Sequence, residues 1–564
     1  MPVDRRIAYF SMEVGLKTEM PTYSGGLGVL SGDTLRAAAD LGAPMVAVTL
    51  LYRQGFFRQH LAADGSQTET APKWEPESFL EPIDTLVKLR LEGREVCLKP
   101  WLYRVQGDGG SDIPLYMLDA DLPENDPEDR ALTGQLYGGD QRYRLRQEGL
   151  LGIGGIAMLH ALGYDQLDTF HMNEGHSALL TLALLNEIKG SSATVTEGDI
   201  ATVRNLCVFT THTPVPAGHD RFPLELVRSV LGDRMADLIE ALPVRDDDFL
   251  NMTLLGLFFS RYVNGVARRH GEVAQGLYPH YKVSAITNGV HAVTWVSDAF
   301  AQLYDRKLTG WRGDSHYLRQ ALDLSVEDVM DAHKRAKRDL IGEVAKRTGV
   351  QLDPSVMTIG FARRAAAYKR ADLVFSQPEM LRQIARNVGP IQFVYAGKAH
   401  PHDVQAKELI KRVVAAGAEV EADVSVVYLE EHDMALGKLL TSGVDLWLNN
   451  PQKPLEASGT SGMKAALNGV PSLSVLDGWW PEGWIEGVTG WSIADGLDDG
   501  DPVQESLSLY NKLSYVILPL FYGSPSLYGR VMRSTIAING AYFTTERMLQ
   551  QYLNSAYVVP GVES

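Results

Sequence analysis

Short apolar runs rich in β-branched residues recur along the chain, and longer stretches of mixed polarity separate them. Such runs are typical of strands that are buried on both faces of a parallel sheet. The pattern predicts strands over residues 6–11, 45–51, 206–211, 357–362, 391–396, 424–429 and 444–448.

Helices are expected between these strands. One helix should begin at Ser325, because Ser325 and Asp328 have the spacing of a capping box, and it should end at Gly349. Apolar residues follow the period of a helix at Val329, Ala332, Ala336, Leu340 and Val344. Strand and helix therefore alternate, which indicates an α/β fold with right-handed crossovers.

The series of strands runs twice. The first set ends before about residue 295, and the second opens at residue 357 after a charged, helical stretch over residues 300–350. We therefore expect two doubly wound domains that face one cleft. Sheets of this kind bind ligands at the carboxyl ends of their strands.

Charge and cysteine usage narrow the class of protein. The 564 residues carry a formal net charge of −17, which disfavours a broad surface for nucleic acid but allows a small cationic pocket. The two cysteines, Cys97 and Cys207, lie far apart, so no disulfide framework is expected. The N-terminus lacks the apolar core of a signal peptide, and no apolar run reaches ~18 residues. We expect a cytoplasmic protein without a membrane span.

A glycine-rich segment, Ser24-Gly25-Gly26-Leu27-Gly28, precedes a helix expected over residues 33–41. Glycines let backbone N–H groups approach a ligand, and the start of a helix favours an anion. A tight turn that needs positive φ explains the same glycines equally well, so the motif alone leaves both interpretations open.

Four cations, Arg363, Arg364, Lys369 and Arg370, fall within eight residues directly after the strand predicted over residues 357–362. Their position is the carboxyl end of a strand, and such a cluster suits an anion in an otherwise acidic chain. A solvated helix face is the alternative interpretation. The strand that comes just before favours the anion site.

The segment EASGTSGMKAALNG, residues 456–469, places small hydroxyl and glycine residues before a helix that carries Lys464. Backbone N–H groups and hydroxyls of such a turn can hold a phosphate. A lysine one turn later can form a Schiff base with a cofactor aldehyde. Taken alone, however, a capped helix with an exposed lysine explains the segment better.

Histidines follow two further strands, with His171 and His176 in the segment 170–176 and His212 in the segment 211–213. Metal binding is one interpretation, but no third ligand keeps a suitable spacing, so no metal site is predicted. Recognition of sugar hydroxyls suits these groups better. For each histidine taken singly, the interpretation as a buried side chain with satisfied hydrogen bonds stays open.

Taken together, these segments resemble the glycogen/starch (α-glucan) phosphorylase family, and residues 479–484 (WWPEGW) look like its short bacterial and archaeal branch. The resemblance spans nearly the whole chain, and EASGT-x-x-MK is its most specific motif. The matching segments occur in the family's order: IAYFSMEVG, SGGLGVLSGDTL, YGGDQRYRLRQE, HMNEGHSAL, TTHTP, NMTLLGLFFSRYVNGVA, ITNGVHAVTW, RRAAAYKR, YAGKAHPHDVQAK and EASGTSGMKAALNG.

The resemblance implies two Rossmann-like doubly wound domains that face a cleft, the GT-B arrangement. Residues 1–300 would form an N-terminal domain for glucan and phosphate, and residues 301–535 a C-terminal domain for pyridoxal phosphate. Residues 536–564 would form a helical segment that packs back toward the N-terminal domain.

The implied activity is that of a glycosyltransferase. It would cut α-1,4-glucan (glycogen, starch or maltodextrin) at non-reducing ends with inorganic phosphate and release glucose 1-phosphate with retention. The cofactor would be pyridoxal 5′-phosphate, whose phosphate acts as acid and base toward the substrate phosphate. The resemblance is compatible with a homo-oligomer and implies no partner beyond glucan and phosphate.

Position by position, the resemblance also implies site residues. Lys464 matches the lysine that binds the cofactor. The residues expected at the cofactor are Thr460, Ser461, Arg363 and Gly26. The residues expected to bind the substrate phosphate are Gly25, Gly26, Arg364 and Lys369. The residues expected to bind the glucosyl ring are Glu456, Ser458, Gly459, His176, His212 and Asn264. A loop that gates the site is expected at Asp140 and Gln141. The catalytic set is expected to be Arg364, Lys369, His176, Glu456 and Lys464.

Two other classes of protein share parts of this pattern. A nucleotide-sugar glucosyltransferase of the glycogen-synthase type would have the two domains and a basic phosphate pocket, but it would not need Lys464. A glucan-binding relative without activity would not need Lys464, Arg364, Lys369 and His176 together.

Overall fold

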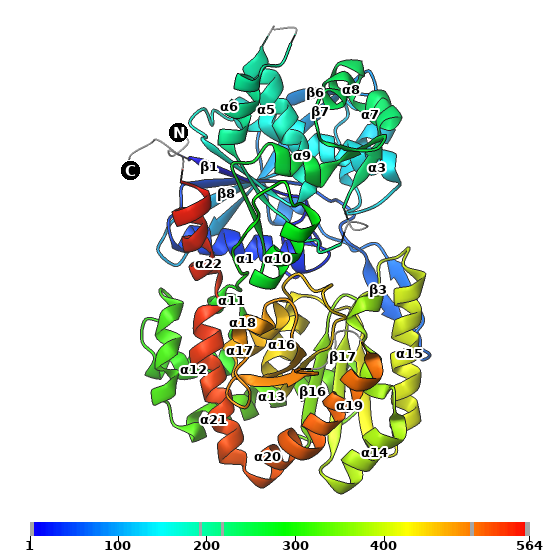
Figure 1. The fold of residues 1–564 in the computed structure, drawn as a ribbon, viewed down its shortest axis with the longest axis vertical. Helices are drawn as coiled ribbons and strands as arrows, with labels where there is room; N and C mark the ends of the chain where they lie inside the picture. The colour runs from blue at the N-terminus through cyan, green and yellow to red at the C-terminus, as the bar shows by residue number, and fades with distance from the viewer. Residues whose placement is uncertain (1–4, 191–193, 216–218, 497–500, 559–564) are drawn as a thin grey trace. The chain divides into compact units, whose positions relative to one another are not determined.

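The computed structural model describes residues 5–190, 194–215, 219–496 and 501–558 (Figure 1). Its contacts divide the chain into two compact units, each made from segments that are distant in the sequence. Unit 1 consists of Met1–Phe57, Ala71–Ile286 and Met548–Ser564. Unit 2 consists of Arg58–Thr70 and Thr287–Arg547.

Unit 1 is built on a mixed sheet whose central part is parallel. Among the described residues, its strands lie in the order β15-β14-β10-β9-β1-β2-β8-β7-β5, with β6 paired to β7. The pairs from β15 to β8 are parallel, whereas β7 pairs antiparallel with β5, β6 and β8. The strands are β1 (Ile7–Ser11), β2 (Met45–Leu50), β5 (Glu81–Pro82), β6 (Val87–Leu91), β7 (Arg94–Gln106), β8 (Asp112–Asp119), β9 (Thr169–Asn173), β10 (Cys207–Thr210), β14 (Tyr262–Gly265) and β15 (Ser284–Ala285).

Helices cover both faces of this sheet, as a buried parallel sheet requires. Alternate residues of β1 enter two different cores: Ala8 and Phe10 lie in one core, and Ile7 and Tyr9 lie in the other. The helices of unit 1 include α1 (Gly26–Asp40), α3 (Gln141–Gly149), α4 (Gly155–Ala161), α5 (Leu179–Lys189), α6 (Glu197–Leu206), α7 (Leu224–Leu231), α8 (Asp233–Glu240), α9 (Met252–Phe258) and α10 (Arg268–Leu277).

The C-terminal residues complete the second of these cores. Helix α22 (Thr545–Gln551) leads into residues that pack with Ile7 and Tyr9 of β1, and Figure 1 shows this red segment beside the blue strands. The Tyr557 hydroxyl lies 2.7 Å from Nδ1 of His171, and the Tyr552 hydroxyl accepts a hydrogen bond of 2.9 Å from Nδ2 of Asn264. The last described residues are therefore part of the interior of unit 1.

Unit 2 is built on a parallel sheet. Among the described residues the strand order is β18-β17-β16-β19-β20-β21, and every pair is parallel. In sequence rank this order is 3-2-1-4-5-6, which is that of the doubly wound Rossmann sheet. The strands are β16 (Met357–Ala362), β17 (Ile391–Ala396), β18 (Val424–Leu429), β19 (Leu446–Asn449), β20 (Ser472–Val475) and β21 (Gly490–Ile493).

The helices of unit 2 lie between and after these strands. They include α11 (Ala292–Trp295), α12 (Asp298–Lys307), α13 (Val326–Thr348), α14 (Pro378–Asn387), α15 (Val404–Val420), α16 (Met434–Gly443), α17 (Ser461–Leu467), α19 (Pro502–Lys512), α20 (Leu518–Gly523) and α21 (Pro525–Thr535). Leu340 of α13 and Leu436 of α16 share a buried cluster with Val394 of β17 and Trp447 of β19. These contacts attach the helices to one face of the sheet.

The predicted strands are confirmed to within two residues at each end. The helix predicted from Ser325 is also confirmed: Oγ of Ser325 accepts the backbone N–H of Asp328 at 3.0 Å, and Gly349 ends α13 with φ +75°. The helix expected over residues 33–41 begins earlier, because α1 starts at Gly26 within the glycine-rich segment. Close packing explains Gly28 and Gly32, since an added Cβ would lie 2.6 Å from Oε2 of Glu13 at Gly28 and 1.8 Å from the carbonyl oxygen of Gly15 at Gly32.

The units also differ from the predicted domain ranges of 1–300, 301–535 and 536–564. Residues after Ile286 join unit 2, where the backbone N–H of Ser297 donates to Oδ1 of Asn468 at 2.8 Å. The hairpin of β3 (Arg58–Leu61) and β4 (Gln67–Thr70) also belongs to unit 2, because Nε2 of Gln67 donates to the carbonyl of Ala399 at 2.8 Å. Neither attachment has a signature in the local sequence.

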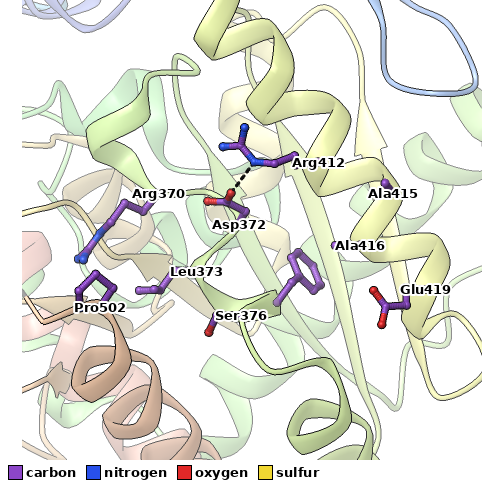
Figure 2. Close-up of a pocket in the computed structure, with 10 residues that line it drawn as sticks. Arg370, Asp372, Leu373, Ser376, Arg412, Ala415, Ala416, Glu419 and Pro502 are labelled. Atoms are coloured by element: carbon purple, nitrogen blue, oxygen red, sulfur yellow. Dashed lines mark hydrogen bonds and ion pairs between the residues drawn. The ribbon is translucent and has the colours of Figure 1, made fainter.

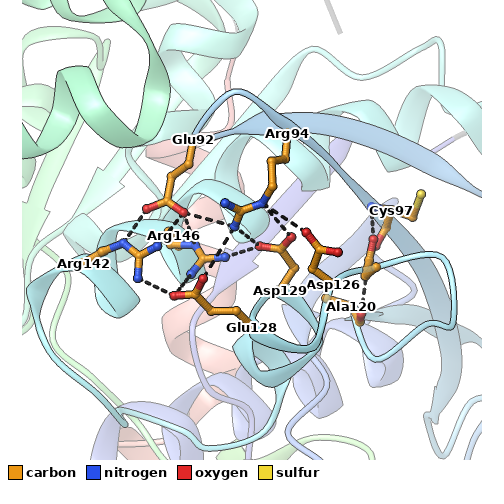
Figure 3. A network of polar contacts seen from close by, with 10 residues as sticks. Glu92, Arg94, Cys97, Ala120, Asp126, Glu128, Asp129, Arg142 and Arg146 are labelled. Carbon is orange, nitrogen blue, oxygen red and sulfur yellow. Dashed lines mark hydrogen bonds and ion pairs between the residues drawn. The ribbon is translucent and has the colours of Figure 1, made fainter.

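A network of ion pairs fixes the start of α3 (Figure 3). Arg146 is 2% exposed and pairs with Asp129, which is 1% exposed, while Arg142 bridges Glu92 and Glu128. Breaking a buried pair of this kind costs ~3–5 kcal/mol, because one charge is then left uncompensated. The network therefore holds the helix that begins at Gln141.

Candidate active site

Two candidate site residues of unit 2, one expected at the cofactor and one expected to be catalytic, meet where the strand order reverses. Arg363 directly follows β16, and Glu456 lies in the loop that follows β19, the neighbouring strand. Nη2 of Arg363 donates to Oε2 of Glu456 at 2.5 Å, and both side chains are buried. Doubly wound sheets bind ligands at this kind of reversal, outside the carboxyl ends of the strands.

The charged side chains at this point favour the binding of an anion. Burial and the charge of Arg363 lower the pKa of Lys369 to about 7, although Glu456, whose Oε2 is 4.0 Å from Nζ of Lys369, opposes the shift. Burial raises the pKa of Glu456, but Arg363 and Lys369 outweigh burial and hold that pKa below its ordinary value. Cationic side chains therefore outnumber carboxylates here, with the exposed Arg364 adjacent.

Two buried polar atoms at this site have no partner among the described residues: Nη1 of Arg363 and Oγ of Ser458. A buried donor without an acceptor is costly, so a ligand that supplies an acceptor to Arg363 would be stabilised here. Gly459 packs closely against this ion pair: its φ is +81°, and an added Cβ would lie 3.3 Å from Oε1 of Glu456 and 3.4 Å from Nη2 of Arg363. An anionic group, such as the phosphate of a cofactor, fits this arrangement.

Helix α17 carries Lys464. Thr460 stands at its N-cap, and Oγ of Ser461 accepts the indole N–H of Trp447 at 3.1 Å. Nζ of Lys464 lies 3.5 Å from the ring centroid of Trp295, which is nearly fully buried. An aromatic wall beside a lysine suits a planar cofactor ring.

His432 lies close enough to Lys464 to be affected by its charge. Burial and the charge of Lys464 lower the pKa of His432 to about 3, so its imidazole is uncharged at neutral pH. Both His432 and Trp295 face Gly437, at 3.5 Å and 3.8 Å from the Cβ position of that glycine. Sequence reasoning did not identify His432, because no motif surrounds it.

The candidates of unit 1 also gather at a reversal of strand order, between β1 and β9. Glu13, just after β1, holds the glycine-rich segment: its Oε2 accepts the backbone N–H groups of Ser24 at 2.6 Å and of Gly25 at 3.2 Å. Added Cβ atoms at Gly25 and Gly26 would contact nothing within 4 Å. The start of α1 thus has open space beside it, as an anion-binding segment requires.

His176 and His212 follow β9 and β10. Nε2 of His176 lies 3.3 Å from Oδ2 of Asp220, and Nε2 of His212 lies 2.6 Å from Oδ1 of Asn173. Burial lowers the pKa of His212 to about 4 against the opposing charge of Glu174. Both imidazoles are therefore held in fixed orientations by neighbouring polar groups.

The other candidates of unit 1 have different surroundings. Asn264 is fully buried, and its amide is engaged by Thr210, Gly265 and Tyr552. Asp140 caps α3, with Oδ1 accepting the backbone N–H of Tyr143 at 2.9 Å, and Gln141 beside it is exposed. The expected gating residues thus stand at the exposed start of a helix.

A separate surface pocket of about 550 Å³ lies on unit 2 beside α15 (Figure 2). Its cations are already engaged: Nε of Arg412 donates to Oδ2 of Asp372 at 2.9 Å, and Arg370 binds Glu505 and the carbonyls of Asn450 and Pro451. This pocket therefore offers less to an anion than the site at Arg363.

The described residues contain no group of three or more histidine, cysteine, aspartate or glutamate side chains arranged to hold a metal ion. None of their helices is long and apolar enough to cross a membrane.

Fold and site together define an α/β protein with a cluster of cationic side chains around Glu456 at the strand reversal of a parallel sheet. A family model described as carbohydrate phosphorylase matches residues 237–479. A maltodextrin phosphorylase of Thermococcus litoralis is 37% identical over 98% of this chain and 70% of its own length. A glycogen phosphorylase of Mycobacterium tuberculosis is 38% identical over 99% and 71%, and one of Aquifex aeolicus is 33% identical over 98% and 86%. The chain belongs to the carbohydrate phosphorylase family, which confirms the resemblance seen in the sequence.

Proposed function

We propose that this chain is an α-glucan phosphorylase, a glycosyltransferase that transfers glucosyl units from the non-reducing ends of α-1,4-glucan to inorganic phosphate. The relatives named maltodextrin phosphorylase and glycogen phosphorylase support this class of substrate. The observation that carries the proposal is the buried Arg363, which binds Glu456 through one nitrogen and leaves another without a partner among the described residues.

We further propose that Lys464 holds pyridoxal 5′-phosphate, with Thr460, Ser461 and Arg363 around the cofactor's phosphate. When bound, that phosphate would supply a group that exchanges protons at neutral pH. The aromatic ring of Trp295 and the uncharged His432 support a planar ring beside Lys464.

The residues of this chain would act mainly through charge and position. Arg363, Arg364 and Lys369 would offset the repulsion between two neighbouring phosphates and the charge that builds up in the transition state. Glu456, Ser458 and Gly459 would orient the glucosyl ring, with Gly25 and Gly26 toward the substrate phosphate. Retention of configuration, the GT-B arrangement and the gating by Asp140 and Gln141 belong to the same proposal.

Release of glucose 1-phosphate tests the activity. The purified chain should release it from glycogen and maltodextrin only when phosphate is present, and not from cellodextrin. Release that instead needs a nucleotide sugar, or no release at all, would contradict the proposal.

The cofactor can be tested without any assay of activity. Borohydride reduction followed by peptide mapping should place a pyridoxyl label on Lys464. The Lys464→Ala variant should lose the visible absorbance of the cofactor, whereas Lys438→Ala, in the adjacent α16, should keep it. A label on another lysine would overturn the assignment.

A further inference from the structure

Arg144, Glu148 and Asp220 form a cluster of charged groups next to His176 in unit 1. None of the roles given so far accounts for this cluster. Nη2 of Arg144 lies 2.8 Å from Oδ2 of Asp220 and 3.5 Å from Oε1 of Glu148. The same oxygen of Asp220 lies 3.3 Å from Nε2 of His176. One guanidinium thus faces two carboxyl groups.

Glu148 has an unusual environment for a carboxylate. Its side chain is 0% exposed, and neither carboxyl oxygen accepts a hydrogen bond from any described residue. An ionised carboxylate is only an acceptor, so in this position it would have no hydrogen bond and would share the single charge of Arg144 with Asp220. A protonated carboxyl could instead donate to Asp220, because both carboxyl groups face the same nitrogen, Nη2 of Arg144.

We propose that Glu148 and Asp220 hold one proton between them, carried on Glu148, and that Asp220 remains the carboxylate that orients His176. The charges then balance, because Arg144 faces a single negative charge. The Glu148–Asp220 pair is a positioning device, since neither side chain is assigned to the reacting atoms.

Electrostatics agree with the geometry. Burial and the charge of Asp220 raise the pKa of Glu148 well above its ordinary value. Burial also raises the pKa of Asp220, but its contacts with His176 and Arg144 outweigh burial and hold that pKa below its ordinary value. Two neighbouring carboxyl groups whose pKa values diverge in this way titrate as one coupled pair.

Other titratable groups around the pair are already engaged or neutral. The Tyr137 hydroxyl donates to Oε1 of Glu13 at 2.9 Å, and its ring lies under the guanidinium of Arg144. Burial raises the pKa of Tyr52 and lowers the pKa of His219, so both are uncharged at neutral pH. His219 also contacts the hydroxyl of Thr253.

The consequence for His176 concerns its tautomer. Because Nε2 faces the carboxylate of Asp220, that nitrogen carries the hydrogen, and in the neutral imidazole Nδ1 is then an acceptor. Nδ1 is buried and has no partner among the described residues. His176 would therefore accept a hydrogen bond from a sugar hydroxyl. This last step rests on the proposed function, whereas the shared proton does not.

Infrared spectroscopy of the whole protein tests the shared proton directly. At neutral pH, the difference spectrum between wild type and Glu148→Gln should contain the C=O stretch of a protonated carboxylic acid in the wild type. Glutamine keeps the size of the side chain and can still donate to Asp220, so the variant should fold. Loss of a carboxylate band instead would overturn the proposal.

Stability gives a second readout. Between the ordinary pKa of glutamate and the raised pKa, the folded protein holds one more proton than the unfolded chain, so its stability falls as pH rises. Glu148→Gln removes this effect, and its Tm relative to wild type should increase between pH ~5 and ~8. Parallel pH profiles would contradict the shared proton.

Kinetics test the orientation of His176. The KM for glucan should be about tenfold higher in Asp220→Asn than in Glu148→Gln. Only the first change removes the carboxylate that fixes the tautomer of His176. Equal effects would overturn the positioning role. A chain without phosphorylase activity would contradict the proposed function, yet it would still show the infrared band if the proton is shared.

Discussion

Arg363 combines a strong ion pair with an unsatisfied donor, and both follow from its position directly after β16. Glu456 neutralises one side of the guanidinium, while Nη1 on the other side has no acceptor among the described residues. The sequence pattern identified Arg363 as part of a cationic cluster. It did not identify the pairing with Glu456, because 93 residues separate the two.

Removing the exposed cation of this cluster should affect phosphate more than glucan. In Arg364→Ala, we expect kcat/KM for phosphate to fall by ~10²-fold, the loss typical for one donor to a developing negative charge. Arg412→Ala is the matched control, because Arg412 is 57% exposed and already paired with Asp372. Steady-state kinetics with phosphate as the varied substrate decide the matter. Equal losses in both variants would mean that the anion site has been misplaced.

Lys369 should make phosphate binding depend on pH. Its pKa in the ligand-free protein is lowered to about 7, so the ammonium loses its proton as pH rises through neutrality. The KM for phosphate should therefore increase above about pH 7. In Lys369→Arg the cation stays charged, and the slope of this increase should become smaller. An identical pH profile in both proteins would show that Lys369 does not titrate at the phosphate.

At the scale of elements, local patterns were sufficient for the seven predicted strands but not for α1. An apolar run such as residues 357–362 needs no distant information, since burial on both faces determines its composition. The start of α1 is different, because the glycines at its beginning have a poor intrinsic tendency to form helix. Two glycines of this helix have a packing reason, the close approach of Gly28 to Glu13 and of Gly32 to Gly15, which only the folded chain reveals.

Two glycines in helices should respond in opposite directions to alanine. In Gly32→Ala the new Cβ would lie 1.8 Å from the carbonyl oxygen of Gly15, so the backbone must shift, at a cost of ~1–3 kcal/mol. Gly342 in α13 has nothing within 4 Å of an added Cβ, so Gly342→Ala should stabilise by ~0.5–1 kcal/mol. Calorimetric unfolding measures both changes. A stabilising Gly32→Ala would contradict the packing described for α1.

At the scale of the whole molecule, the division into units was the part that the sequence predicted least well. Composition does not change where the chain passes from one unit to the other, near residues 57, 70, 286 and 547. The hairpin over residues 58–70 joins unit 2 through side-chain contacts of Gln59 and Gln67 with residues more than 300 positions away. Partners this distant leave no periodic pattern.

The C-terminal contribution to unit 1 can be measured through Tyr552. In Tyr552→Phe, Nδ2 of Asn264 and the hydroxyl of Thr210 lose a buried partner, which should cost ~1–3 kcal/mol. Tyr515→Phe is the control, because Tyr515 is 78% exposed and its change should be close to zero. Hydrogen exchange of β10 and β14 reports the local effect. Unchanged exchange in Tyr552→Phe would show that the C-terminal residues do not stabilise this sheet.

The discontinuous units have a consequence for the order in which a growing chain can fold. A ribosome releases residues from the N-terminus onward, so the strand that starts the central sheet of unit 1 emerges first. Unit 1 is nevertheless completed only by residues 548–557, which contribute to its second core. Unit 2 has all of its segments once Arg547 has emerged. Unit 1, whose strand β1 precedes every strand of unit 2, can therefore be completed only after unit 2, and until residues 548–557 have been made its sheet lacks part of its cover.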